Sequence, residues 1–174
     1  NNLVQGYISR HSGDDYGAIF IEKVSYRDCP QLIYCTPKIR YPFDDQDRWH
    51  FPKAVEIRRF EKLDGTNIFA FSYENEKGDK FVTYKTRLKP FLGDSKFGPF
   101  LEMWKGVILE RYGKLFPFIV LNEGYNLSFE LWGSRNAHLI KYNEPLDASL
   151  LFVRSGQIIK PPPMSAAFIK DSNI

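Results

Sequence analysis

The sequence predicts an α+β domain that is built from antiparallel sheets and has few helices. Short apolar or alternating runs recur along the chain and are separated by Gly, Asn and Pro, which is the pattern of strands joined by turns. One segment, residues 97–113, has the spacing of an amphipathic helix. With 174 residues, of which 43% are hydrophobic, the chain can bury a sizeable core, so we expect residues 1–174 to form one domain.

The first strands are expected in the N-terminal third of the chain. Residues 16–21 are strand-like and follow a turn, and a short strand is expected at 32–34 among prolines that interrupt other regular structure. Aromatic residues at 41–43 and 49–51 have two interpretations, as a packed connection over the core or as the wall of a ligand cleft. The sequence does not separate these two.

Three further strands are expected at 55–60, 68–73 and 81–84, and a charged turn joins the last two. The first of these strands alternates apolar and polar residues and ends shortly before Lys62. Because side chains alternate along a strand, Lys85 and Arg87 belong to one side of the third strand or its continuation. There they face an anionic ligand or form a basic, solvated sheet edge.

The predicted helix has an apolar stripe that includes aromatic side chains. Large apolar residues recur at four-residue steps from Phe100 to Tyr112, which places them on one face. Asp94 or Ser95 is a candidate residue for the N-terminal end, and Gly113 is a candidate stop. A stripe of this kind belongs to the core far more often than to a cofactor site, so we expect the helix to pack on the sheet.

A second group of strands is expected in the C-terminal half, at 116–121, 127–131, 137–142 and 150–153. Glu130 lies in one of them among apolar neighbours, where an unpaired carboxylate would be unfavourable. It therefore needs a partner, which is either a structural arginine or a bound ribose.

Composition narrows the class of protein. A formal net charge of +3 permits a nucleic-acid partner without demanding one. Cys29 and Cys35 are the only cysteines, so neither a disulfide framework nor a four-thiolate zinc site is available within the chain. Long apolar segments and a signal-peptide pattern are absent from the sequence, so we expect a soluble intracellular protein, cytoplasmic or nuclear, with no membrane partner.

The strongest functional signal lies in residues 61–68, which read Glu-Lys-Leu-Asp-Gly-Thr-Asn-Ile. Lys62 shortly precedes an acid and Gly65, so the chain can turn sharply and aim the amine into a cleft. A lysine amine is protonated near neutral pH, and it attacks a substrate only where burial or a neighbouring cation, such as a metal, favours the unprotonated form. A lone lysine in this setting would be an ordinary solvated turn, so the other segments must agree with it.

Residues 61–67 resemble the first motif, Lys-x-Asp-Gly, of the covalent nucleotidyltransferases, which comprise ATP-dependent RNA and DNA ligases and RNA capping enzymes. They look most like the phage-type RNA ligases. Segments 83–87, 127–133 and 149–154 resemble later family motifs and follow in the family's order. The resemblance implies an antiparallel-sheet nucleotidyltransferase (adenylation) fold, in which Lys62 forms a covalent phosphoramidate with a nucleoside monophosphate.

The resemblance also implies roles for the matching residues. Glu130 binds the ribose hydroxyls, Arg87 contacts the nucleotide phosphate, and Phe152 is the candidate platform for the base. Asp64 orients the lysine amine or holds a metal-bound water, or it stabilises the turn; metal ligands are not assigned. The implied nucleotide-binding residues are Glu61, Lys62, Asp64, Gly65, Lys85, Arg87, Glu130 and Phe152.

The function implied by the resemblance is ATP-dependent RNA ligation, with ATP and Mg²⁺ or Mn²⁺ as cofactors and RNA ends as partners. The family's fourth motif, an acid-Gly pair before an apolar strand, and its fifth, Lys-x-Lys, do not follow the third motif before Ile174, so the chain resembles a partial catalytic domain. Two alternatives stay open: a GTP-dependent RNA capping enzyme, in which the same lysine carries GMP, and a nucleotide- or RNA-binding module without turnover.

Overall fold

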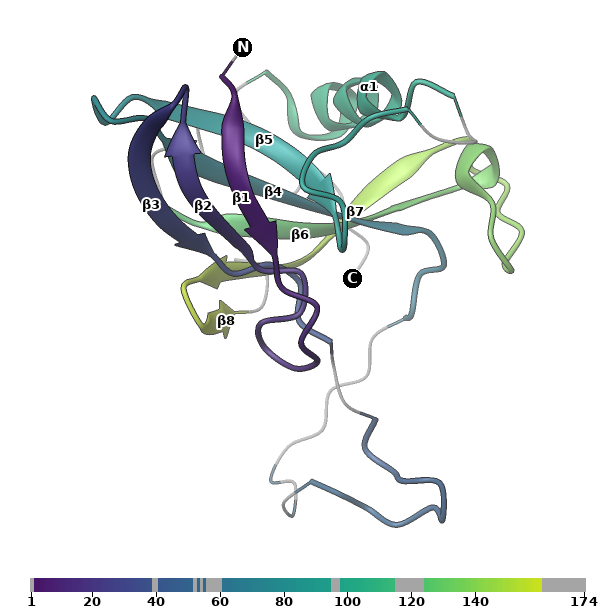
Figure 1. The fold of residues 1–174 in the computed structure, drawn as a ribbon. Coiled ribbons are helices and arrows are strands. Elements are labelled where there is room, and N and C mark those ends of the chain that lie inside the picture. The colour runs from purple at the N-terminus through teal and green to yellow at the C-terminus, as the bar shows by residue number, and fades with distance from the viewer. Residues whose placement is uncertain are drawn as a thin grey trace.

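The computed structural model describes residues 2–38, 41–51, 53, 55, 61–94, 98–114 and 124–160. The described residues form two antiparallel sheets and one α-helix (Figure 1). The small sheet has the order β1-β2-β3, with strands Val4–Ile8, Ile19–Val24 and Arg27–Ile33. The large sheet has the order β5-β4-β6-β7-β8, with β4 at Thr66–Glu74, β5 at Lys80–Thr86, β6 at Asn126–Trp132, β7 at Asp147–Ser155 and β8 at Ile158–Lys160. The helix α1 spans Phe100–Tyr112, and a 3₁₀ turn, η1, spans Ser134–Asn136.

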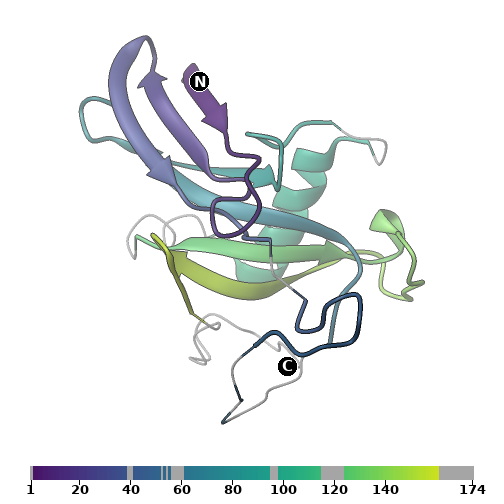
Figure 2. The same cartoon turned by 60° about the horizontal axis from the view of Figure 1, so that its bottom comes forward.

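Strand β4 is apolar on both faces because the large sheet is covered on both sides. Its alternate residues Ile68 and Ala70 join the core cluster under α1, while Phe69 and Phe71 join the cluster beneath the small sheet. This two-sided burial explains why β4 has a continuous apolar run rather than simple alternation. Figure 2 shows the resulting layers, with α1 and the small sheet on opposite sides of the large one.

The helix packs on the large sheet as the apolar stripe predicted. Trp104 is fully buried, and its ring makes edge contacts with the rings of Tyr84 and Phe129 at centroid distances of 5.6 and 5.3 Å. The helix ends at Gly113, whose φ of 77° favours glycine and whose N–H donates to the Leu109 carbonyl. Pro99 occupies the capping position, so the expectation for Asp94 was wrong, and the other candidate, Ser95, lies outside the described residues.

Gly106→Ala is expected to stabilise the fold by about 0.5–1 kcal/mol. Gly106 lies on the exposed side of α1, and an added Cβ would meet no other atom within 4 Å, so alanine supplies only its higher helix propensity. Denaturant unfolding measures the change. Gly113→Ala is the matched control and should destabilise the protein because of its positive φ; equal effects of the two substitutions would contradict the prediction.

The expected α+β class with few helices is confirmed for the described residues, and so are the strands at 68–73, 81–84, 127–131 and 150–153. The expected strand at 16–21 begins later, at Ile19, because residues 13–17 form a turn. The strand at 32–34 is longer than expected and passes through Pro30, which lies on an edge strand at a register irregularity. The expected strands at 55–60, apart from its first residue, and at 116–121 lie outside the described residues.

The strand expected at 137–142 was wrong. Gly133, at φ 128°, passes so close to Leu146 that an added Cβ would lie 2.8 Å from its Cα, and η1 then leads the chain into a loop. Both long edges of β6 are already paired, with β4 and β7, so this segment has no place beside it. Its apolar residues Leu139 and Ile140 are 92% and 46% exposed, which sequence alternation alone did not anticipate.

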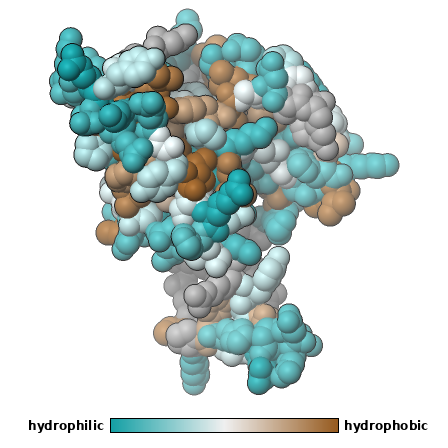
Figure 3. Space-filling view, viewed as in Figure 1, coloured by the Kyte–Doolittle hydropathy of each residue, from teal (hydrophilic) through white to brown (hydrophobic). Residues whose placement is uncertain are grey.

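Residues 41–51 form a loop that extends away from both sheets (Figure 1). Its rings Phe43, Trp49 and Phe51 pack on one another, with centroids 5.2 and 5.7 Å apart, so they do not lie over the core. Polar and apolar residues are interspersed on the face of the molecule drawn in Figure 3. Among the helices of the described residues, none is long and apolar enough to cross a membrane.

Candidate functional site

The start of β4 brings the expected site segments together. Lys62 lies in the loop that leads into β4, while β5 and β6 flank β4 on its two sides. The register pairs Asn67 of β4 with Glu130 of β6, and the antiparallel pairing with β5 places the end of that strand, just before Arg87, beside the same part of β4. Lys62, Arg87 and Glu130, which are distant in the sequence, therefore gather at one end of the large sheet.

Gly65 is fixed by a close approach between two backbones. A Cβ at this position would lie 2.1 Å from the carbonyl oxygen of Leu131 on β6. The Gly65 N–H donates a 3.1 Å hydrogen bond to Oε1 of Glu130. The glycine predicted from the motif is therefore required by packing, and its amide holds the acid expected to bind the ribose.

Glu130 is a partly buried carboxylate whose surroundings have opposing effects on its pKa. Burial raises its pKa, whereas the hydrogen bond from Gly65 and the charges of Lys62 and Arg87 lower it, and Asp64 raises it. Lys62 and Arg87 thus both act on Glu130. The partner that the sequence demanded for this acid is a backbone N–H with two nearby cations, rather than a buried structural arginine.

Asp64 anchors the loop that follows η1. Its Oδ2 accepts hydrogen bonds from the backbone N–H groups of Leu139 and Ile140 at 2.6 and 2.7 Å, and its own N–H donates to the Tyr142 hydroxyl at 2.8 Å. These backbone bonds, from Ile140 first and Leu139 next, lower the Asp64 pKa. Of its expected roles, the geometry favours stabilisation of the turn that carries Lys62.

The remaining site residues differ in exposure. Glu61, Lys62 and Arg87 are exposed, so each is open to a ligand. The Arg87 guanidinium lies 5.8 Å from the centre of the Tyr16 ring, within the range of a cation–π contact. Phe152 is half-buried and packs against the core beneath the small sheet, so its role as a base platform stays a prediction.

Lys85 is the expected site residue whose surroundings differ most from a ligand contact. It is fully buried, and its Nζ donates to the carbonyls of Gly17 and Arg87 at 3.0 and 2.8 Å. Burial lowers the Lys85 pKa, an effect opposed by the adjacent Cys35 thiol and reinforced by Arg87. The amine is enclosed by protein atoms, so direct contact with a nucleotide phosphate is not supported by this geometry.

Sequence reasoning missed a chain of polar side chains beside Glu130. Asn67 Nδ2 donates to Ser128 Oγ at 3.0 Å and to the Phe129 carbonyl at 2.9 Å, and Ser128 Oγ lies 2.9 Å from Thr36 Oγ1. Within the described part of the chain, the buried Asn67 Oδ1 has no hydrogen-bond partner. The signal that could have found this group is the Thr66-Asn67 pair after the glycine, two polar residues at the start of an apolar strand.

The side chains of the described residues do not by themselves form a metal site. Among the described residues, no group of three or more His, Cys, Asp or Glu side chains is placed to hold a metal ion. Two acids at the Lys62 loop, Asp64 and Glu130, already accept backbone hydrogen bonds. A divalent cation here would need ligands from nucleotide phosphates, as Mg²⁺ commonly does.

Glu130→Gln is expected to change the pH dependence of stability. Because burial raises the Glu130 pKa above its ordinary value of 4.5, the wild-type protein loses stability as pH rises from that value through the folded pKa. Glutamine does not titrate, yet it keeps an oxygen to accept the Gly65 N–H. Thermal unfolding between pH 4 and pH 8 should therefore show that the unfolding temperature of the variant increases relative to that of the wild type as pH rises.

If Glu130 binds the ribose hydroxyls, as the resemblance implies, the same substitution should weaken nucleotide binding by roughly ten- to a hundred-fold, since a hydrogen bond to a charged group contributes about 1.5–3 kcal/mol. Glu102→Gln, on the exposed side of α1, is the control and should alter neither property. A Glu130→Gln difference in unfolding temperature that stays constant with pH would show that the Glu130 pKa is not raised.

The sequence matched no protein-family model in a scan, and a search of curated proteins found no match either.

Proposed function

We propose that this protein is an ATP-dependent RNA ligase that uses Lys62 as its covalent nucleophile. The observation that carries the proposal is the meeting of Lys62, Arg87 and Glu130 at the start of β4, with Gly65 bonded to Glu130. The resemblance implies that these three residues are, in turn, a nucleophile, a phosphate contact and a ribose contact.

In the first step, Lys62 Nζ, which is exposed, loses a proton to solvent and attacks the α-phosphorus of ATP. A phosphorus–nitrogen bond forms, the bond to the β-phosphate oxygen breaks, and pyrophosphate leaves. Arg87 is exposed beside Glu130 and would offset the negative charge that develops on the phosphates. A divalent cation bound with the nucleotide would supply further charge stabilisation.

Two later steps transfer the nucleotide and seal the strand. An oxygen of an RNA 5′-phosphate attacks the lysine-bound AMP, the phosphorus–nitrogen bond breaks, and the Lys62 amine takes up a proton. A 3′-hydroxyl then loses its proton to solvent and attacks the activated 5′-phosphate, the phosphoanhydride bond to AMP breaks, AMP leaves, and a phosphodiester bond forms. Throughout, Glu130 would hold the ribose hydroxyls, because Gly65 fixes one of its oxygens and leaves the carboxylate oriented.

Two features support a nucleotide as the ligand. Polar groups line β4 and β6 beside Glu130, and Asn67 Oδ1 is buried among them without a hydrogen-bond partner in the described residues. Phe152 lies on β7, opposite Ser128 of β6, so an aromatic side chain is near this polar row. The choice of ATP over GTP rests on the resemblance to RNA ligases.

The test is intact-mass measurement after incubation with ATP or with GTP and magnesium. We expect an AMP-sized increase with ATP only. A GMP-sized increase would replace ligation with RNA capping. An unchanged mass together with nucleotide binding would contradict the ligase proposal and indicate a binding module without turnover. Joining of a 5′-phosphorylated RNA to a 3′-hydroxyl RNA then tests the later steps.

A further inference from the structure

The buried amine of Lys85 joins the two sheets next to the candidate site. Lys85 lies near the end of β5, whereas Gly17 belongs to the turn that precedes β2 of the small sheet. The amine donates to the Gly17 and Arg87 carbonyls at 3.0 and 2.8 Å. One side chain thus donates hydrogen bonds to a carbonyl before β2 of the small sheet and to a carbonyl after β5 of the large sheet.

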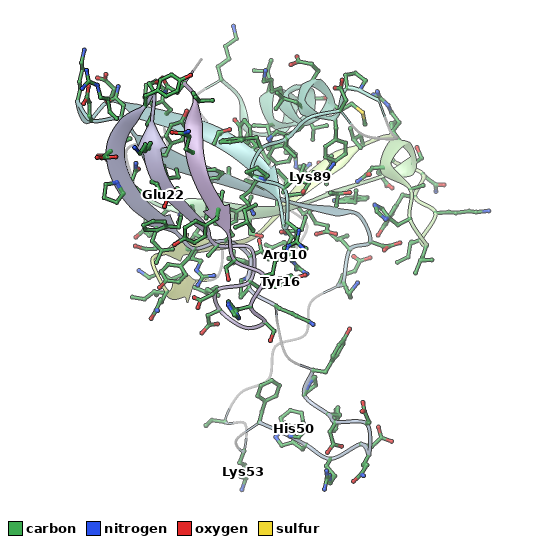
Figure 4. All side chains as sticks on the ribbon, in the orientation of Figure 1. Arg10, Tyr16, Glu22, His50, Lys53 and Lys89 are labelled. Atoms are coloured by element: carbon green, nitrogen blue, oxygen red, sulfur yellow. The ribbon has the colours of Figure 1, made fainter. Side chains whose placement is uncertain are left out.

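The turn approaches Arg87 as closely as backbones allow. Gly17 has φ 79°, and a Cβ on it would lie 2.4 Å from the Arg87 carbonyl oxygen. The neighbouring Tyr16 ring lies under the Arg87 guanidinium. In Figure 4, the labelled residues Arg10 and Tyr16 mark the segment that contains this turn. The main chain and the side chain of Arg87 are therefore both in contact with the turn.

Removing the amine would leave two carbonyl groups without their donor in a buried place. A buried polar group that loses its partner destabilises its surroundings. The simplest relief is separation of the turn from β5, which would let water reach the carbonyls. Because Arg87 supplies one of these carbonyls, its position depends on Lys85.

We propose that Lys85 is a positioning residue, which fastens the Tyr16–Gly17 turn to the end of β5 and thereby holds Arg87 beside Glu130 and Lys62. This inference rests on the proposed function, in which Arg87 contacts the nucleotide phosphates. It replaces a direct phosphate contact by Lys85 with an action through Arg87.

A second buried cation provides a matched control. Arg154 is fully buried, and its guanidinium donates to the carbonyls of Cys35, Asp14 at 3.3 Å and Gly156 at 2.8 Å. It therefore also connects the N-terminal segment to the large sheet. It makes none of these bonds to Arg87, so its loss should loosen the fold without releasing the site arginine.

The test combines Lys85→Met, Arg154→Met, Arg87→Ala and the double variant of Lys85→Met with Arg87→Ala. The rate of lysine–AMP formation is measured in a single turnover over a range of ATP concentrations. We expect Lys85→Met to slow this step at least about tenfold, and to add no further slowing in the Arg87→Ala background, because it acts through Arg87. Arg154→Met should change the rate less than about twofold while lowering the unfolding temperature. The proposal would be overturned if the double variant were slowed by the product of the two single effects, or if Arg154→Met slowed lysine–AMP formation as much as Lys85→Met does.

Amide hydrogen exchange gives a measure that does not depend on activity. Lys85→Met should speed exchange in segment 84–90, next to Arg87, whereas Arg154→Met should not, although Arg154 also contacts the turn through Asp14. Equal exchange in segment 84–90 for the two variants would overturn the proposal. If the wild-type protein forms no adduct, the proposed function fails and exchange alone decides whether Lys85 fastens the turn. Should Lys85→Met fail to fold, Lys85→Gln, whose shorter side chain cannot replace both hydrogen bonds of the amine, takes its place in the same experiments.

Discussion

Lys62→Ala should abolish the covalent nucleotide adduct, to below about a thousandth of the wild-type level, and Lys62→Arg should do the same. Only an amine that can lose its proton forms the phosphoramidate, and an arginine guanidinium stays protonated. Lys62 is exposed, so both variants should keep their stability within about 0.5 kcal/mol of the wild type. Intact-mass measurement reports the adduct, and thermal unfolding reports the fold.

The arginine variant separates chemistry from charge. If Lys62 contributes only its positive charge to Glu130, Lys62→Arg would preserve nucleotide binding and activity alike. The proposal requires that Lys62→Arg reduce adduct formation much more than it reduces nucleotide binding. Lys105→Ala, an exposed lysine on α1, is the control and should react as the wild type does. An adduct that persists in Lys62→Ala and maps to another lysine would remove Lys62 from the role of nucleophile.

Gly65→Ala should destabilise the protein by about 3 kcal/mol. A Cβ on Gly65 would lie 2.1 Å from the Leu131 carbonyl oxygen and 3.0 Å from Trp132 Cα, and both are backbone atoms that cannot rotate away. The start of β4 would have to separate from β6 to make room for the methyl group. The expected loss of stability therefore lies at the upper end of the range of about 1–3 kcal/mol that is usual for overpacking. Denaturant unfolding measures the loss. Nucleotide binding should fall as well, because the Gly65 N–H would no longer hold Glu130.

Gly93→Ala is the matched control for this substitution. Gly93 is exposed, its φ lies outside the positive range that favours glycine, and an added Cβ would meet no other atom within 4 Å. Its effect should stay within about 0.5 kcal/mol. If Gly65→Ala were equally mild, the close approach of β4 to β6 would not hold in solution.

The helix and the central strands could be predicted because their patterns are local. An apolar stripe from Phe100 to Tyr112 describes a helix face, and a run such as Ile68 to Phe71 describes a buried strand, wherever they occur. The strand expected at 137–142 failed for the opposite reason. Its alternation was typical of a strand, but both edges of β6 were already occupied, and Asp64 took up two of its backbone N–H groups.

The candidate site divides in the same way. The sequence by itself determined which residue types stand where: a lysine before a tight glycine turn, an acid within an apolar strand, and basic residues at the end of β5. Only the tertiary structure decided that Lys85 is enclosed between two carbonyls while Arg87 is exposed, although both follow the same alternation. The reason is that burial depends on what covers a strand, and here the cover is a turn that lies 68 residues away from Lys85 in the chain.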